Sequence, residues 1–422
     1  MSNNATAPPG YEWGERTKQG WRALKGYAPE KDWKTDAEEM RSYFGISRFD
    51  PTDFDQRDGR IASWIYPDML IHEWDSKLTT RERGVSTLVR GKRGSGKTTL
   101  RDYLAIRLIE DDSKNLDIDC PNDERVVIRG RPDSSDWRRI NHWTTLWLPS
   151  GCNARVDVRA RSDDTLSVDD LARDVVYYDG VMDLLRQIEE RPSGTINVVY
   201  PDPEFRECQE VIEQASGVPY EIEVFPESEP HEDYGATPTS SWWFCFLLAR
   251  SSFGKLWDDD DNPMWMTVQL DEIVELAPEN PPGGPKGHYT WEFVQMLTEM
   301  MIDTRKVGLS IIGYCHFTSD VASVWRKQFN VRISMPDDRP NPIAGRSSTF
   351  PAGWDSVKME QDLISHHNPG VGLCYSESKF SKFSWDEMAR QDSDPELPPF
   401  RLEIGKSADN RTFQTGGTSA DD

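Results

Sequence analysis

The clearest hydrophobic pattern in the chain is a short apolar run that ends at a glycine-rich loop and is followed by apolar residues at helical spacing. The run over residues 85–89 predicts a buried strand. Beyond the loop, apolar residues recur every three or four positions up to a polar stretch at 111–114: Leu100, Tyr103, Leu104, Leu108 and Ile109. This periodicity predicts a helix, so the segment is expected to fold as strand, loop and helix.

Other apolar runs predict further strands and a buried helix. Residues 264–270 and 307–315 are nearly continuous apolar runs that stop at polar residues. Residues 124–129, 143–148 and 154–161 alternate as strands do. The apolar run at 242–249 follows Thr239, Ser240 and Ser241, which are good helix-capping residues. Strands alternating with helices predict an α/β fold, with a mostly parallel sheet flanked by helices.

The long stretch between the glycine-rich loop and the strand at 264–270 predicts an insertion. We expect an N-terminal extension or arm over residues 1–60 and the first part of the core over 61–119. A β-rich inserted α+β subdomain follows over 120–235, with a strand, a helix and a strand at 195–200, 203–215 and 220–225. The second part of the core covers 236–390. A C-terminal strand and a flexible tail occupy 391–422.

The glycine-rich loop has the full G-x-x-x-x-G-K-[ST] pattern of a phosphate-binding loop. Its glycines allow the backbone N–H groups to wrap around a polyanion, and the lysine reaches the β- and γ-phosphates. A chance match is the alternative, but strand, loop and helix all agree with a P-loop NTPase. The residues predicted to bind ATP are Gly91, Arg93, Gly94, Ser95, Gly96, Lys97, Thr98 and Thr99.

Two acids follow the apolar run at 264–270 and complete the predicted nucleotide site. Asp271 is expected to hold Mg²⁺ together with the Thr98 hydroxyl. Glu272 is expected to orient and deprotonate the attacking water, while Lys97 stabilises the phosphates. Without the phosphate loop, an ordinary strand end with two surface acids would be the better interpretation.

The ordered set of these elements resembles the HerA/FtsK superfamily of DNA-pumping ATPases, which includes conjugative coupling proteins and viral packaging ATPases. The similarity runs from about residue 84 to about residue 375. In that family an Asp-Glu strand precedes a long helix, an Arg-rich turn and a strand that ends in a polar sensor, usually Gln. The resemblance implies that the long helix lies at 290–305 and that a further helix follows at 321–329. The sensor position is His316, which can still hydrogen-bond a γ-phosphate or a water.

The resemblance also implies partners. Family members act on double-stranded DNA as homohexameric rings, and each active site is completed by an arginine from the neighbouring subunit. Arg326 and Arg332 are the candidates for this catalytic arginine, with Arg305 behind them; each could equally be a surface arginine.

An arginine-rich segment lies within the predicted insertion. Residues 125–161 contain eight arginines and three acids, and Trp137 and Trp143 are interleaved with them. Guanidinium groups with aromatic residues suit a nucleic-acid backbone. An arginine-rich sheet face paired with carboxylates explains the same composition, and the sequence leaves both interpretations open.

The global composition is acidic. The chain has 73 acids and 49 bases, a net charge of −24, and 16 of the bases are lysine against 33 arginines. A carboxylate-rich, lysine-poor surface predicts a halophilic source, an archaeon or one of its viruses or plasmids, and a merely acidic mesophilic protein is the alternative. The longest apolar run spans eight residues and no signal peptide is visible, so we expect no integral membrane segment. The expected location is the cytoplasm, or the virion for a virus-encoded protein. The six scattered cysteines lack a C-x-x-C pair and predict reduced thiols.

The leading hypothesis from the sequence is therefore an ATP-hydrolysing, Mg²⁺-dependent motor that moves DNA for packaging, transfer or processing. The alternative is a nucleotide-dependent switch or assembly NTPase that moves nothing. A degenerate scaffold is disfavoured, because such a protein has no need to keep Lys97, Thr98, Asp271 and Glu272 together.

Overall fold

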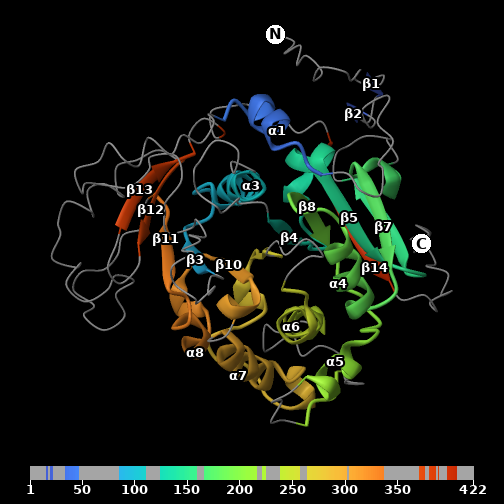
Figure 1. The fold of residues 1–422 in the computed structure, drawn as a ribbon, viewed down its shortest axis with the longest axis vertical. Helices are drawn as coiled ribbons and strands as arrows, with labels where there is room; N and C mark the ends of the chain where they lie inside the picture. Colours follow the sequence, from blue (N-terminus) through green and yellow to red (C-terminus); the bar gives the residue numbers. More distant parts are fainter. Residues whose placement is uncertain are drawn as a thin grey trace, which may run out of the picture.

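The computed structural model of the protein is organised around one ten-stranded sheet (Figure 1). It describes residues 16–17, 20–21, 34–46, 85–110, 124–158, 166–215, 221–224, 238–256, 264–301, 304–336, 370–375, 380–385, 388 and 397–405. In sheet order, the strands are β13 (Phe380–Ser384), β12 (Val371–Tyr375), β11 (Val331–Ser334), β3 (Ser86–Arg90), β10 (Leu309–Cys315), β9 (Met266–Leu270), β4 (Arg125–Arg129), β8 (Thr195–Val199), β5 (Thr144–Pro149) and β7 (Asp174–Tyr178). All neighbours from β11 to β7 run parallel, whereas β12 and β13 are antiparallel. The predicted mostly parallel α/β sheet is confirmed.

Helices cover both faces of this sheet, which is why its central strands are buried throughout (Figure 1). On one face lie α1 (Ala37–Phe44) and α3 (Lys97–Leu108), with the 3-10 helix η2 (Asp136–Trp143). On the other lie α4 (Val181–Glu190), α5 (Cys208–Gln214), α6 (Pro238–Phe253), α7 (Thr290–Met301) and α8 (Ser323–Arg326). Every residue of β4 and β9 is buried between these two layers.

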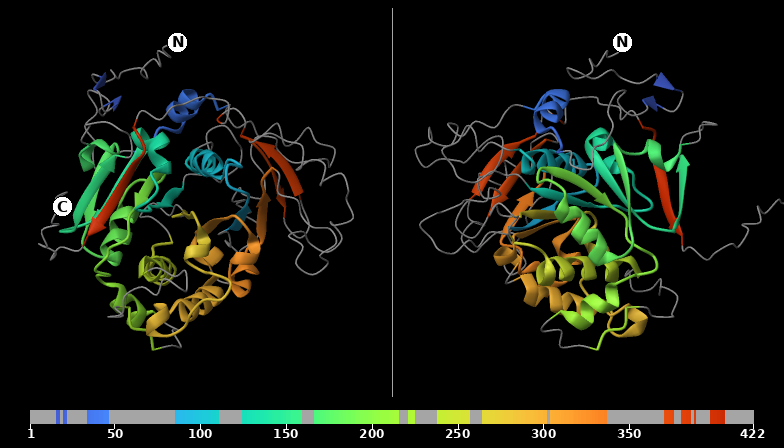
Figure 2. Two further views of the ribbon diagram at one scale, coloured as in Figure 1. Left: turned by 180° about the vertical axis from the view of Figure 1, so that it is seen from behind. Right: turned by 45° about the vertical axis from the view of Figure 1, so that its right-hand side comes forward.

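Helix α6 is the central helix of its layer and contacts α4, α5 and α7 (Figure 2). All its residues from Ser240 to Ala249 are buried, because neighbouring elements surround it. Trp242 stacks on Phe246, with ring centroids 5.8 Å apart and planes 7° apart. The predicted buried helix is thus confirmed.

The predicted insertion does not form a sheet of its own. Strands β4, β8, β5 and β7 extend the central sheet beyond β9. The physical reason is that the apolar run of β4 is buried on both faces, as a central parallel strand requires. Among the described strands of the insertion, β6 (Asn153–Val158) alone leaves the sheet, and it pairs with β14 (Phe400–Gly405) as a separate two-stranded ribbon. The boundaries of the predicted domains stay a prediction.

Several local expectations differ from the structure. The helix expected over 290–305 ends at Met301, and the short 3-10 helix η7 (Thr304–Val307) follows. The helix expected over 321–329 is the single turn α8. Of the strand expected at 220–225, the described residues 221–224 form no strand.

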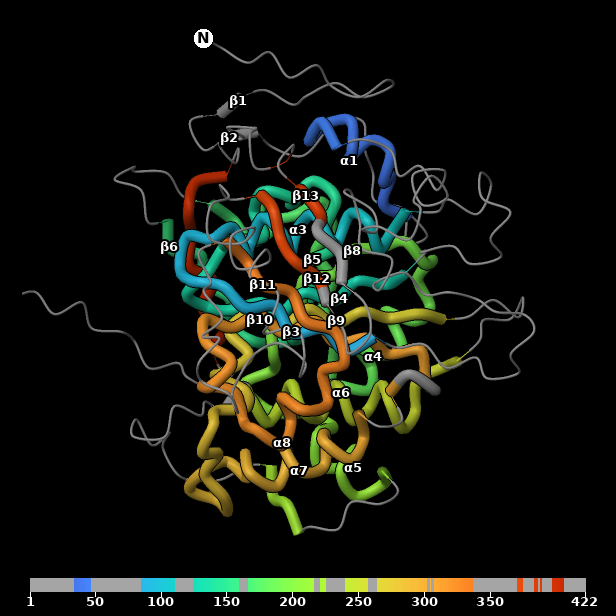
Figure 3. Tube along the Cα trace, turned by 90° about the vertical axis from the view of Figure 1, so that its left-hand side faces the viewer, coloured from blue at the N-terminus to red at the C-terminus, as the bar shows by residue number. Residues whose placement is uncertain are grey.

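The remaining described elements are short. They are β1 (Arg16–Thr17), β2 (Gly20–Trp21), η3 (Val168–Asp170), η5 (Ile273–Glu275), η6 (Pro285–Gly287) and η8 (Thr318–Asp320). The Asp36 side chain caps the start of α1, and Gly45 caps its end. Figure 3 shows α1 above α3. Within the described residues, no helix has the length and apolar character needed to cross a membrane.

Candidate nucleotide site

The phosphate loop connects β3 to α3, as predicted, and its glycines are required by geometry. Gly94 and Gly96 have φ angles of 79° and 92°, in the left-handed region that favours glycine. Gly91 has no room for a side chain, because a Cβ there would lie 2.5 Å from Ser95 Oγ and 2.6 Å from Met335 Cβ. The loop leads directly into the first turn of α3, where free backbone N–H groups favour an anion.

The order of the central strands brings the other candidate residues to this loop. Strands β3, β10 and β9 are parallel neighbours, so their carboxyl ends meet at one edge of the sheet. The last residue of β10 is the register partner of the last residue of β3. The residues that follow the three strands, Gly91, His316 and Asp271, are therefore neighbours.

Lys97, His316 and Glu272 form a continuous chain of side-chain contacts at this edge. Lys97 Nζ donates to the carbonyl oxygens of Gly91 and Lys92, at 2.6 and 3.2 Å. It also lies 2.9 Å from His316 Nδ1, and His316 Nε2 lies 3.1 Å from Glu272 Oε1. Because an ammonium group can only donate, one tautomer satisfies both contacts: Nδ1 accepts from the lysine and Nε2–H donates to the glutamate.

The backbone of Glu272 is unusual. Its φ and ψ are 46° and 56°, a left-handed conformation that costs a non-glycine residue about 1–3 kcal/mol. Such strain persists only when the surroundings enforce it, and it concentrates at functional sites. Here the conformation turns the chain abruptly after β9, and the carboxylate reaches His316.

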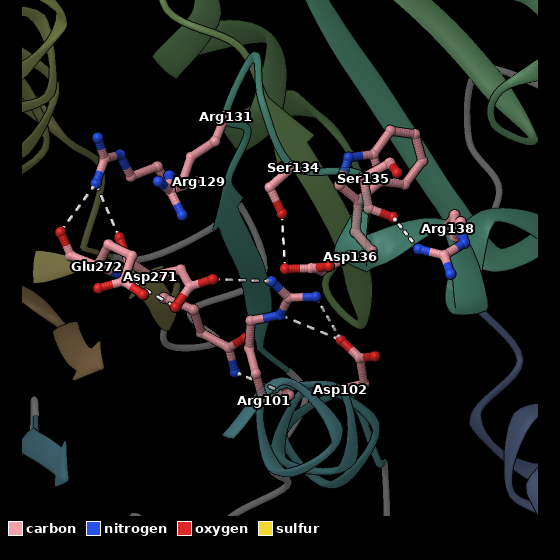
Figure 4. Close-up of polar contacts among 12 residues, drawn as sticks. Arg101, Asp102, Arg129, Arg131, Ser134, Ser135, Asp136, Arg138, Asp271 and Glu272 are labelled. Atoms are coloured by element: carbon pink, nitrogen blue, oxygen red, sulfur yellow. Dashed lines mark hydrogen bonds and ion pairs between the residues drawn. The ribbon is translucent and has the colours of Figure 1, made fainter. Parts of the chain in front are cut away.

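A buried arginine lies behind Asp271 (Figure 4). Arg101, from the second turn of α3, has its Nη1 atom 3.8 Å from Asp271 Oδ2. Its Nε and Nη2 atoms donate to Asp102 Oδ1, at 3.1 and 2.9 Å. Burial lowers the pKa of Arg101, but the charges of Asp102 and Asp271 outweigh this effect and raise it above its usual range. A permanent cation therefore faces Asp271, whose Oδ1 accepts from the Glu272 amide at 3.0 Å.

The loop fits a nucleotide phosphate with a hard cation. Ser95 Oγ is buried and has no hydrogen-bond partner among the described residues, and a phosphate oxygen would supply one. Thr98 lies in the first turn of α3 and is partly exposed, and the Asp271 side chain is 13% exposed. Hydroxyl and carboxylate oxygens are ligands that Mg²⁺ prefers, so these two residues would hold it.

The arginines predicted from the family resemblance have different surroundings. Arg326 donates to the carbonyl oxygens of Thr318 and Val321 and lies 3.7 Å from Glu279. Arg332 is partly buried on β11. The side chain of Arg305 lies outside the described residues. In the loop itself, Arg93 is exposed. The catalytic roles of Arg326 and Arg332 stay predictions.

The arginine-rich segment is partly buried where the structure describes it: Arg125 and Arg129 are buried, and Arg131, Arg138 and Arg139 are partly exposed. Arg125 donates to the carbonyls of Ile188, Glu189 and Arg191, at the end of α4. Arg129 and Arg131 both bond Glu275. These contacts match the ion-paired interpretation for this part, although Arg155 is exposed and residues 159–161 lie outside the described ranges.

Sequence reasoning missed several polar residues at the site. Arg101 lies behind Asp271, Arg129 bonds the main chain there, and Arg139 donates to Thr99 Oγ1 at 3.1 Å. The available signal was the position of Arg129 directly after the apolar run Val126–Ile128, where a buried cation needs several acceptors.

Several solved structures align with this chain at low sequence identity. The genome packaging NTPase B204 from Sulfolobus turreted icosahedral virus 2, in complex with sulfate, aligns over 71% of this chain and 96% of its own, with TM-score 0.34 and 12% identity. The pCW3 conjugation coupling protein TcpA aligns over 76% and 70%, with TM-score 0.32 and 10% identity. VirB4 of Thermoanaerobacter pseudethanolicus aligns over 79% and 99%, with TM-score 0.37 and 13% identity. No protein-family model and no curated protein matches the sequence.

The parallel sheet and the phosphate loop, rather than these distant similarities, define the class. The chain has the α/β fold of a P-loop NTPase, with its loop between β3 and α3 and its acidic residues after β9.

Proposed function

We propose that this protein hydrolyses ATP to ADP and phosphate with Mg²⁺ as cofactor. The observation that carries the proposal is the continuous contact from Lys97 through His316 to Glu272, beside a loop that fits a phosphate. These three side chains come from α3 and from the ends of β10 and β9, elements far apart in the sequence.

Each residue has a role that follows from its chemistry. Lys97 would exchange the carbonyls of Gly91 and Lys92 for the β- and γ-phosphate oxygens. Glu272 would orient the attacking water and accept its proton, and His316 Nε2–H would hold the Glu272 carboxylate in place. Mg²⁺, held by Thr98 and Asp271, would neutralise charge on the β- and γ-phosphates.

We further propose that hydrolysis drives movement of double-stranded DNA through a homohexameric ring of the HerA/FtsK type. The ordered motifs of the sequence support this proposal, as does the placement of β10 between β3 and β9. In such a ring, Arg326 or Arg332 would complete the site of a neighbouring subunit. Packaging, transfer or processing of DNA would be the task, in the cytoplasm or in a virion.

The test is steady-state ATP hydrolysis in low-salt buffer and in molar KCl, with and without long double-stranded DNA. We expect a rate that is lost in Lys97→Ala and on removal of Mg²⁺, and that DNA raises severalfold. A rate that depends on Lys97 but not on DNA would favour the nucleotide-dependent switch instead. Binding of ATP without any turnover would contradict the proposed hydrolysis.

A further inference from the structure

The strained turn after β9 is held by a single buried guanidinium group. Arg129 Nη1 donates to the carbonyl oxygens of Asp271 and Glu272, at 2.8 and 3.3 Å (Figure 4). Its Nη2 atom donates to Glu275 Oε2 at 2.8 Å. Glu275 in turn closes the turn, because its backbone N–H donates to the Glu272 carbonyl at 2.9 Å. One side chain thus contacts both peptide units of the Asp-Glu pair and the carboxylate that follows.

The position of Arg129 in the fold makes these contacts possible. It is the last residue of β4, the parallel neighbour of β9, so its side chain lies at the carboxyl edge next to the turn. The Arg129 side chain is only 4% exposed. Burial lowers its pKa, although the charge of Glu275 opposes that effect. A cation buried this deeply is costly unless its donors are used, and here they are used on the turn.

We propose that Arg129 is a positioning residue for the hydrolysis proposed above. It fixes the left-handed backbone of Glu272 by binding the two main-chain carbonyls, and so keeps the carboxylate aimed at His316 and the phosphate loop. This inference rests on the proposed function. The guanidinium touches neither the nucleotide-binding loop residues nor a reacting atom in the contacts described, so its effect passes through the backbone of the turn.

Arg131 provides a matched control two residues further on. Its Nη2 atom bonds the other oxygen of the same carboxylate, Glu275 Oε1, at 2.6 Å. The Arg131 side chain is 15% exposed, and it also lies 3.6 Å from Asp133. Arg131 binds the same carboxylate as Arg129 but makes no described contact with the carbonyls of Asp271 or Glu272. Substituting each arginine in turn therefore distinguishes the effect of supporting the turn from the effect of pairing with Glu275.

The experiment compares Arg129→Met and Arg131→Met in the full chain. Three quantities are measured: the Kd of a fluorescent ATP analogue, kcat, and the melting temperature. We expect Arg129→Met to lower kcat about a hundredfold, because a displacement of the Glu272 carboxylate by about 1 Å can cost that much. The Kd of the ATP analogue should be nearly unchanged. Arg131→Met should keep kcat close to that of the original protein.

A purely structural role predicts a different result. In that case Arg129→Met lowers the melting temperature while kcat per folded molecule stays unchanged, which would overturn the inference. If Arg129→Met does not fold, Arg129→Lys replaces it, because lysine keeps the buried charge but not the planar fork of donors. We then expect a lower kcat with unchanged Kd, and an unchanged kcat would overturn the inference. Absence of Lys97-dependent hydrolysis in the original protein would overturn the proposed function and this inference together.

Discussion

Glu272 is the residue on which the proposed chemistry depends most directly. Its carboxylate is 26% exposed and contacts His316, so it is accessible to a water molecule yet fixed in direction. His316 is in contact with Lys97 at the same time. A nucleotide that draws Lys97 towards its phosphates would therefore remove one partner of the histidine that orients Glu272. In the proposed mechanism, His316 would therefore both sense the nucleotide and position the base.

We predict that Glu272→Gln lowers the single-turnover rate of ATP hydrolysis by about 10²–10⁴-fold, because the amide cannot accept a proton. Its similar shape should leave the Kd of a fluorescent ATP analogue nearly unchanged. The matched control is Glu213→Gln, which removes an exposed carboxylate on α5, in no described contact with the candidate site. A turnover rate in Glu272→Gln equal to that of the original protein would exclude Glu272 as the base.

Among the elements, α6 contributes most clearly to the core. It is apolar all round and fills the space between α4, α5 and α7. Trp242 is fully buried, lying between Tyr178 and Phe246, with ring centroids 6.1 and 5.8 Å away. Its contacts reach the edge strand β7 through Tyr178, so α6 links the far part of the sheet to the helical layer.

We predict that Trp242→Ala lowers the free energy of unfolding by about 3–5 kcal/mol, the usual cost of a large core cavity. Urea denaturation followed by circular dichroism measures this change. The control is Trp291→Ala on α7, because Trp291 is 41% exposed and its removal leaves little cavity. Equal effects of the two substitutions would contradict the central position of α6.

The elements that the sequence predicted best are those whose signal is local. The phosphate loop and the strands that became β3, β9 and β10 were expected within a few residues, because apolar runs and glycine spacing are sufficient to indicate them. Strands β4 and β7 belong to the central sheet because segments distant in the sequence pair with each other, and no local sequence pattern predicts that pairing. The contact of His316 with Lys97 and Glu272 likewise requires the order of strands. The roles of Arg101 and Arg129 were missed because charged residues in a strand or helix are normally interpreted as surface positions.

At the scale of the whole molecule, the acidic excess governs the response to salt. A net charge of −24 implies self-repulsion in the folded state. Screening shortens the Debye length from about 8 Å at physiological ionic strength to about 3 Å at 1 M. A buried ion pair such as Arg101–Asp102 is screened much less than surface charges, so its stabilising contribution is retained in salt.

We therefore predict that the melting temperature rises between about 0.15 and 1 M KCl, over which the screening length falls severalfold. Differential scanning calorimetry measures the transition, and sorbitol at matched osmolality separates charge screening from general exclusion of the solute. A melting temperature that falls with KCl would contradict the expectation of a salt-adapted protein.

The ribbon of β6 and β14 has a consequence for the order of events during synthesis. Leu402 donates its backbone N–H to the Pro132 carbonyl, and Phe400 donates to Ser135 Oγ, both at 3.1 Å. These contacts fasten the connection after β4, which carries Arg131 towards Glu275. A ribosome exposes Lys97, Glu272 and His316 well before residues 400–405, so the nascent chain can assemble its nucleotide loop while that connection is still unfastened. Vectorial translation thus makes the fastening of the connection after β4 one of the later steps of maturation.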